Sequence, residues 1–132
     1  MVQIKHIKKS FGKQEVLKDV SLEIDDGQVV VILGPSGSGK TTLLRCLNFL
    51  EHGESGEIAV GDTKVELQKA KKKQINNLRK KMGFVFQNYN LFANKTALGN
   101  VMEGLVTARK IPKKEAERIA AEALEWVGLS DR

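Results

Sequence analysis

Alternating apolar and polar positions run through the first part of the chain, and they predict β-strands. Apolar and polar residues alternate along VSLEI and, up to Lys5, along VQIKHI, so both stretches favour a sheet with one solvated face. The turn residues DDG separate them from VVVIL (Val29–Leu33), which is apolar throughout. A continuous β-branched run is typical of a strand buried on both faces in a parallel sheet. The stretch MGFVFQ (Met82–Gln87) predicts a further short strand.

A helical spacing of apolar residues marks the segment after the glycine-rich loop. Four leucines mark this helix, namely Leu43, Leu44, Leu47 and Leu50. We expect the helix to end near Gly53. The sequence GEIAVGDTKVEL predicts a hairpin that turns at Gly61-Asp62. A basic helix should follow the hairpin.

Two more helices are predicted in the last third of the chain. The first has apolar residues at Leu98, Val101, Leu105 and Val106. The second should begin after Pro112 and close at Gly128. Its apolar face consists of Ala116, Ile119, Ala120, Ala123, Leu124 and Val127. Together the elements predict an α/β protein with an antiparallel entry and a helical end.

Composition places this pattern in a cytosolic globular domain. The chain has 132 residues, 41% apolar and 29% charged, which suits one domain with a modest core. No stretch has the length of a membrane span or of a signal-peptide core. The single cysteine, Cys46, lies in a helical pattern and should be a small buried hydrophobic residue.

The net charge of +6 concentrates in two clusters, Lys69–Lys73 and Arg79–Lys81. Such clusters suit either a polyanion-binding patch or the solvated face of a helix. The apolar residues around them keep a roughly helical spacing, and no aromatic residues interleave with the lysines to stack on bases. We therefore favour the solvated helix, and expect no nucleic-acid partner.

The strongest chemical signal is the loop GPSGSGKTT, which matches the P-loop pattern between a predicted strand and a predicted helix. Its nine residues are Gly34, Pro35, Ser36, Gly37, Ser38, Gly39, Lys40, Thr41 and Thr42. Glycines allow successive N–H groups to turn towards an anion, and the following helix adds its positive dipole end. We expect Lys40 to reach the β- and γ-phosphates, Thr41 to ligate Mg²⁺, and Thr42 to approach the α-phosphate.

A P-loop alone fits a transporter motor, a small-molecule kinase or a GTPase, and the residues around it decide between these classes. The sequence from Lys9 to Glu51, KSFGKQEVLKDVSLEIDDGQVVVILGPSGSGKTTLLRCLNFLE, resembles the ATPase subunits of ABC transporters. The resemblance is closest to the polar-amino-acid importers. It implies that Phe11 stacks on the adenine of ATP and that Val16 lies beside the base.

The same resemblance continues to the end of the chain. MGFVFQNYNLFANKTALGNV is similar to the family's Q-loop segment, which implies that Gln87 contacts Mg²⁺ and the attacking water, so Gln87 and Lys40 are the expected catalytic residues. The segment Tyr89–Phe92 should face a membrane-spanning permease subunit, although packing on adjacent helices would explain its large side chains equally well. EALEWVGLSDR resembles the helix and turn that precede the family's signature motif.

The resemblance implies the core of an ABC-type P-loop ATPase in three parts. Residues 1–33 should form the antiparallel β region and the P-loop strand, and residues 34–87 the P-loop, helix, hairpin and Q-loop strand. Residues 88–132 should begin the helical subdomain. In the complete protein, a head-to-tail dimer on the cytoplasmic side of the membrane would couple ATP hydrolysis to uptake of a polar amino acid.

Three family motifs are not found in the sequence: LSGGQ, an apolar strand ending in Asp-Glu, and a switch histidine, for which His6 and His52 lie too early. We therefore expect a chain truncated before the Asp-Glu strand, with two unpaired apolar strands and no hydrolysis by itself. Two other functions remain open. One is a catalytically inactive nucleotide-binding module, and the other is a non-transport ABC ATPase.

Overall fold

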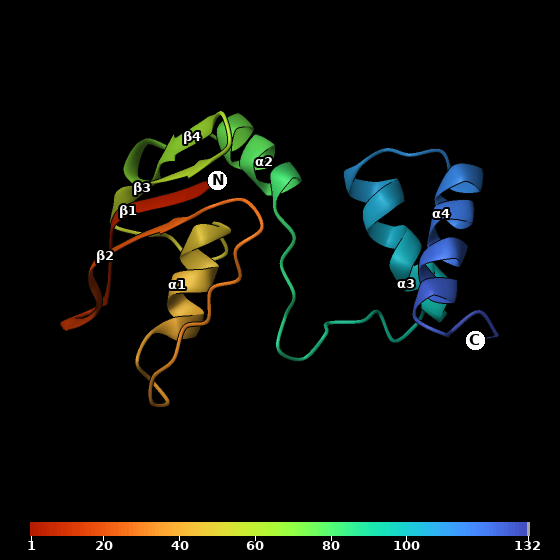
Figure 1. Ribbon diagram of the computed structural model, residues 1–132, viewed down its shortest axis with the longest axis horizontal. Helices are drawn as coiled ribbons and strands as arrows, with labels where there is room; N and C mark the ends of the chain where they lie inside the picture. The colour runs from red at the N-terminus through yellow and green to blue at the C-terminus, as the bar shows by residue number, and fades with distance from the viewer. Residues whose placement is uncertain (132) are drawn as a thin grey trace. The chain divides into compact units, whose positions relative to one another are not determined.

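A computed structural model describes residues 1–131 of the chain, and it consists of two compact units. The first unit, Met1–Phe84, contains every strand of the described residues together with two α-helices (Figure 1). The second unit begins at Val85 and is helical. The P-loop sequence therefore belongs to the first unit and Gln87 to the second.

The first unit is built on a four-stranded antiparallel sheet with the order β2-β1-β3-β4. The strands are β1 (Val2–Phe11), β2 (Gln14–Ile24), β3 (Ser55–Val60) and β4 (Thr63–Glu66). Ile4 on the central strand β1 lies opposite Leu22 on one side and Ile58 on the other. These apolar cross-strand pairs explain the predicted alternation, because residues directly opposite each other share a face. The predicted hairpin is confirmed, since Val60 pairs with Thr63 across the turn.

Gly56 allows β3 to approach β1 closely. Its φ is 115°, and a Cβ added there would lie 2.8 Å from the carbonyl oxygens of both Lys5 and His6. A side chain would therefore meet the backbone of the neighbouring strand, and only glycine fits this position without a shift.

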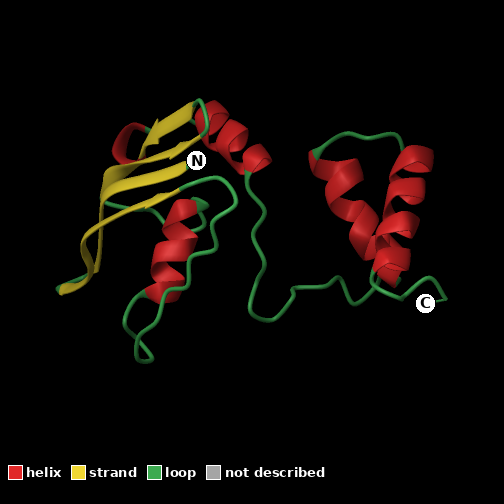
Figure 2. Cartoon of the chain, viewed as in Figure 1, coloured by secondary structure: helices red, strands yellow, loops and turns green. Residues whose placement is uncertain are grey.

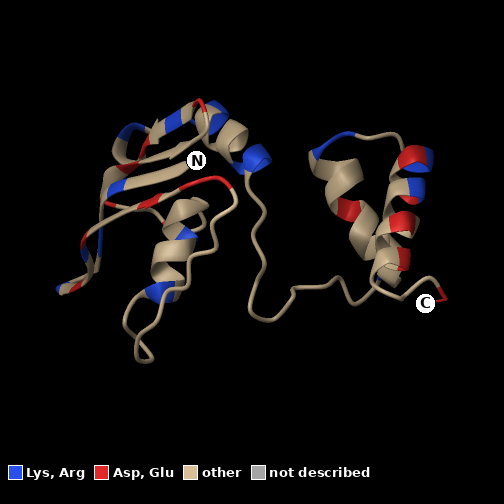
Figure 3. Ribbon diagram, viewed as in Figure 1, with Lys and Arg blue, Asp and Glu red and all other residues tan. Residues whose placement is uncertain are grey.

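Helices α1 (Lys40–Leu47) and α2 (Lys72–Lys81) complete the first unit, with a 3₁₀ turn (Leu67–Lys69) after β4. Its core is formed by nine buried residues, namely Ile4, Ile7, Leu17, Leu43, Cys46, Ile58, Val65, Leu67 and Leu78. Cys46 is fully buried, as predicted, and burial raises the pKa of its thiol. The second basic cluster and the end of the first lie on α2 (Figure 3), whose Leu78 is buried while Lys72 and Lys73 are exposed.

The helix after the P-loop is shorter than predicted, because it ends at Leu47 and not near Gly53. The chain leaves the helix at Phe49, which has a φ of 53°. The Arg79 guanidinium of α2 donates hydrogen bonds to the carbonyl oxygens of Asn48 (3.0 Å) and Phe49 (2.8 Å). These carbonyls would otherwise lack partners at the helix end, so a residue 30 positions further on stabilises the early stop.

Two predicted strands are absent from the structure, and the expectation that Val29–Leu33 would be buried on both faces is wrong. Residues 29–33 and 83–87 form no strand and run as loops (Figure 2). Val29, Val31 and Leu33 are 90%, 72% and 86% exposed, and Val85 is 86% exposed. No strand among residues 1–131 pairs with Val29–Leu33. Its backbone therefore has no neighbouring strand for hydrogen bonds, and the high β-propensity of its side chains is not enough to make it a strand.

The second unit is a helical hairpin. Helix α3 (Ala97–Glu103) continues into a π-helical turn (Gly104–Ala108), and α4 spans Lys113–Trp126 after Pro112, as predicted. Met102, Ala116 and Ala120 form its buried centre, against which four apolar residues pack: Leu98, Leu105, Val106 and Ile111. Val127 departs from the prediction, because it lies beyond the end of α4 and is 67% exposed. Over residues 1–131, no helix combines the length and hydropathy needed to cross a bilayer.

Candidate phosphate-binding loop

The loop from Gly34 to Gly39 leads directly into α1, whose first residue is Lys40. The Lys40 ammonium turns back over the loop and donates to the carbonyl oxygens of Gly34 (2.8 Å) and Pro35 (2.7 Å). A longer contact of 3.5 Å joins it to Ser38 Oγ. An ammonium has three N–H donors. Two of them make the short hydrogen bonds that hold the Lys40 ammonium in place, and the third has only the long contact with Ser38. All three partners are neutral oxygens, and the charge therefore remains available to an anion.

Gly39 is the point at which the loop packs against the sheet. Its φ is 94°, and a Cβ added there would lie 2.9 Å from Val16 Cγ1 and 3.2 Å from Leu17 Cδ2. Both the left-handed backbone and the close approach require glycine. The contact also brings Val16, the residue expected beside the nucleotide base, next to the loop.

The N-terminus of α1 offers backbone donors to the same region. The helix has no acidic residue in its first turn and no side-chain hydrogen bond at its N-cap, Gly39. The first N–H groups of a helix have no partner within it, and they carry the positive end of its dipole. Together with the Lys40 ammonium, they give the loop the donor set of an anion-binding site.

Phe11 lies at the end of β1, where it pairs with Gln14 across the β1–β2 hairpin. Its side chain is 48% exposed, and Lys9 Nζ lies 4.7 Å from the centre of its ring. Lys9 also forms an ion pair with Glu51 at 3.0 Å. The ring therefore has a cation near it and a substantial open surface.

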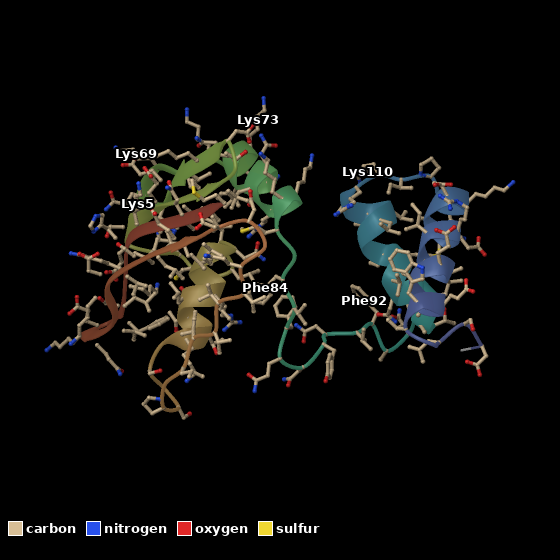
Figure 4. The ribbon with its side chains drawn as sticks, viewed as in Figure 1. Lys5, Lys69, Lys73, Phe84, Phe92 and Lys110 are labelled. Atoms are coloured by element: carbon tan, nitrogen blue, oxygen red, sulfur yellow. The ribbon has the colours of Figure 1, made fainter. Side chains whose placement is uncertain are left out.

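The second unit contains Gln87 and the predicted docking segment. Tyr89, Leu91 and Phe92 are 77%, 71% and 49% exposed, so packing on the helices accounts for little of their surface. The backbone of Phe92 is held by Asn100 of α3, whose Oδ1 accepts from Phe92 N at 2.7 Å and whose Nδ2 donates to Phe92 O at 3.2 Å. Lys95 Nζ lies 4.8 Å from the centre of the Phe92 ring, which is labelled in Figure 4.

Sequence reasoning found the loop but missed the residues that support it. Lys9 and Glu51 lie 42 positions apart, and Arg79 lies about 30 positions from the carbonyls that it binds. None of these pairs has a local sequence signal, because the contacts exist only after the chain folds. Asn100 had a weak signal, as an amide within an apolar helical pattern, where it competes for backbone groups.

The loop fits a nucleotide phosphate on its backbone geometry. A Cβ at Gly34 would lie 2.8 Å from Ser38 Oγ, so a side chain there would crowd this hydroxyl inside the loop. Mg²⁺ would fit here as an ion shared between the Thr41 hydroxyl and the phosphates. Among residues 1–131, no cluster of three or more His, Cys, Asp or Glu could hold a metal, whereas Thr41 supplies one hydroxyl. Mg²⁺ commonly keeps several waters and binds through few protein oxygens plus phosphate.

The antiparallel sheet, the loop and the helix that follows it define a protein of the P-loop nucleotide-binding class. Residues 17–132 match the family described as ABC transporter, and the chain belongs to this family. A probable amino-acid import ATP-binding protein, YxeO of Bacillus subtilis (strain 168), is 48% identical over all of this chain and 53% of its own length. The glutamine transport ATP-binding protein GlnQ of Escherichia coli (strain K12) is 47% identical over all of this chain and 54% of its own length.

A solved structure supports the fold. It is described as the dimeric structure of a post-hydrolysis state of the ATP-binding cassette MJ0796 bound to ADP and Pi, and it matches with a TM-score of 0.78. The match is 33% identical and covers 95% of this chain and 56% of that one. The predicted fold class, an α/β ATPase core of the ABC type, is therefore confirmed. This chain spans about half the length of the curated relatives it matches.

Proposed function

We propose that Gly34–Thr42 binds the phosphates of ATP and that Phe11 and Val16 bind the base. The observation that carries this proposal is the Lys40 ammonium, held over the loop by the carbonyl oxygens of Gly34 and Pro35 at 2.8 and 2.7 Å. A cation that is already oriented loses little freedom when phosphate binds, which favours affinity. The donors at the start of α1 add to it, and the contact between Gly39 and Val16 joins the phosphate and base regions.

Thr41 would hold Mg²⁺ through its hydroxyl, whereas the role of Gln87, in the second unit, stays a prediction from sequence. Bound Mg²⁺ would neutralise charge that develops on the phosphates. Gln87 is neutral, so its amide can orient a water molecule but cannot accept a proton from it. Thr41 is exposed at the start of α1, where its hydroxyl can be reached from solvent.

In the complete protein, this site would power uptake of a polar amino acid by ATP hydrolysis. The support is the naming of the relatives, which include a probable amino-acid import protein and a glutamine transport protein at 48% and 47% identity. The related structure described as dimeric and bound to ADP and Pi supports nucleotide binding by a pair of subunits. The same reasoning favours a location at the cytoplasmic face of the membrane, beside permease subunits.

The proposal is tested by titrating a fluorescent ATP analogue, with Mg²⁺, against the wild-type chain and Lys40→Ala. Loss of charge-assisted hydrogen bonds should weaken binding by about tenfold to a hundredfold. Lys73→Ala is the matched control, because Lys73 is an exposed lysine on α2 (Figure 4) and its loss changes the net charge equally. Equal affinities for the wild type and Lys40→Ala would exclude the loop as the phosphate site.

We also propose that Tyr89, Leu91 and Phe92 dock against a permease subunit. Three large exposed side chains within four residues form an apolar patch, which is typical of an interaction site. Asn100 holds the backbone of Phe92 from α3, so the patch is presented on a defined loop.

In the complete protein, Phe92→Asp should abolish co-purification with the permease while ATP affinity stays at the wild-type value. Ala121→Asp is a suitable control, because Ala121 is exposed on α4 and lies outside the patch. Retention of the permease by Phe92→Asp would rule out this docking surface. Loss of ATP binding as well would mean that Phe92 supports the fold.

A further inference from the structure

We infer that Lys9 and Glu51 are positioning residues for the nucleotide base, because they fix the ring of Phe11. This inference rests on the proposed ATP site. Lys9 and Phe11 are two positions apart on β1, and Lys9 Nζ lies 4.7 Å from the ring centre. A cation over the face of an aromatic ring is attracted by its quadrupole. Lys9 thus occupies one face, and the 48% exposure of Phe11 leaves ring surface for a base.

Lys9 can hold the ring because it is itself held. Its side chain is only 12% exposed, and a lysine this far from water needs a charged partner. Glu51 supplies one at 3.0 Å, and the Lys9 hydrogen bond holds the pKa of that carboxyl below its usual value. Lys9 therefore bridges a carboxylate and an aromatic ring.

The segment that carries Glu51 is attached to β1 at three successive residues. Glu54 N donates to Lys8 O at 2.9 Å, Glu51 pairs with Lys9, and the Glu54 carboxylate accepts from Ser10 N at 2.9 Å. These contacts join the residues after α1 to the last residues of β1, immediately before Phe11. These contacts stabilise the end of β1 just before Phe11.

Glu51 is in turn connected to the phosphate-binding helix. Its backbone N–H donates to the carbonyl oxygen of Arg45, in the last turn of α1, at 3.2 Å. The same helix begins at Lys40. A single rigid element thus carries the phosphate-binding cation at one end and, through Glu51 and Lys9, the base-binding ring at the other. This arrangement sets the ring in place before the nucleotide arrives, which reduces the ordering that binding requires.

Lys9→Met tests the inference, because methionine keeps the length of the side chain and removes its charge. It should weaken ATP binding about two- to fivefold, as expected for a cation–π contact on a half-exposed ring, and leave inorganic tripolyphosphate binding unchanged. Glu51→Gln should also weaken ATP binding. Lys9→Arg keeps the positive charge and should therefore bind ATP with the affinity of the wild type. Lys18→Met, at an exposed lysine of β2, is the matched control and should match the wild type.

Two further measurements separate positioning from other roles. In a Phe11→Leu background, Lys9→Met should have no additional effect on ATP, and in the nucleotide-free protein it should shift the NMR signals of the Phe11 ring. A fall in tripolyphosphate affinity would mean that Lys9 touches the phosphates and would overturn the inference. Unchanged ATP affinity and ring signals in Lys9→Met would overturn it too. If the wild type binds neither ATP nor tripolyphosphate, the proposed function itself fails.

Discussion

Two groups of β-branched residues in the first unit have opposite environments. Ile4, Ile7 and Ile58 lie in the antiparallel sheet and are at most 1% exposed. Val29 and Val31 belong to a continuous apolar run, yet they are 90% and 72% exposed in a loop. By side chain alone, the second group is the better candidate for a buried strand.

The difference teaches that pairing partners decide which apolar segments become strands. Ile4 has hydrogen-bonded strands on both sides, whereas no strand of the described residues pairs with Val29–Leu33. Strand propensity mainly reflects packing against cross-strand neighbours. Without such neighbours, an apolar segment forms no inter-strand hydrogen bonds and its side chains stay exposed.

The largest expected effect comes from cutting matched side chains in the two groups. Ile58→Ala should lower the free energy of unfolding of the first unit by about 2–5 kcal/mol, because it leaves a cavity in a fully buried position. Val31→Ala removes mostly exposed surface and should change it by less than about 0.5 kcal/mol. Native-state hydrogen exchange of the β1 and β3 amides measures both, since it reports on the sheet directly. A cost for Val31→Ala as large as that for Ile58→Ala would show that the run is buried after all.

A smaller effect should follow from pH at the end of the sheet. The hydrogen bond from Lys9 holds the pKa of Glu51 below its ordinary value of 4.5. A carboxyl whose pKa is lowered by folding stabilises the fold above its ordinary pKa, and this stabilisation is lost as the pH falls through the folded-state value. Thermal unfolding should therefore be measured from pH 7 to pH 3. The melting temperature of the wild type should exceed that of Glu51→Gln at neutral pH, and the two melting temperatures should converge in acid.

Val31→Ala is the control for this pH series. Its melting temperature should follow the wild-type curve at every pH, because the run around Val31 contains no ionisable group. A constant difference between wild type and Glu51→Gln across the series would contradict the role of the Glu51 charge. It would assign the effect of the substitution to packing.

The local elements were the part of the fold that could be predicted from sequence. The hairpin at Gly61-Asp62, the start of α4 after Pro112 and the burial of Cys46 each depend on neighbours within a few residues or on side-chain type. The loop proposed to bind phosphate belongs to the same class, since its glycines and Lys40 lie within seven consecutive residues. Turn chemistry, helix starts and P-loops carry their physical cause in short stretches of sequence.

Long-range contacts decided the rest. Val29–Leu33 can form a strand only if another strand lies beside it. The position at which α1 ends depends on Arg79. The surroundings of the Phe11 ring depend on Lys9 and Glu51. Each involves groups tens of residues apart, whose meeting no periodicity encodes. The sequence by itself thus determined the ABC-type nucleotide loop and the kind of element at most positions. Only the tertiary structure decided which apolar runs are paired, because hydrogen bonds and burial require a partner that folding must bring into place.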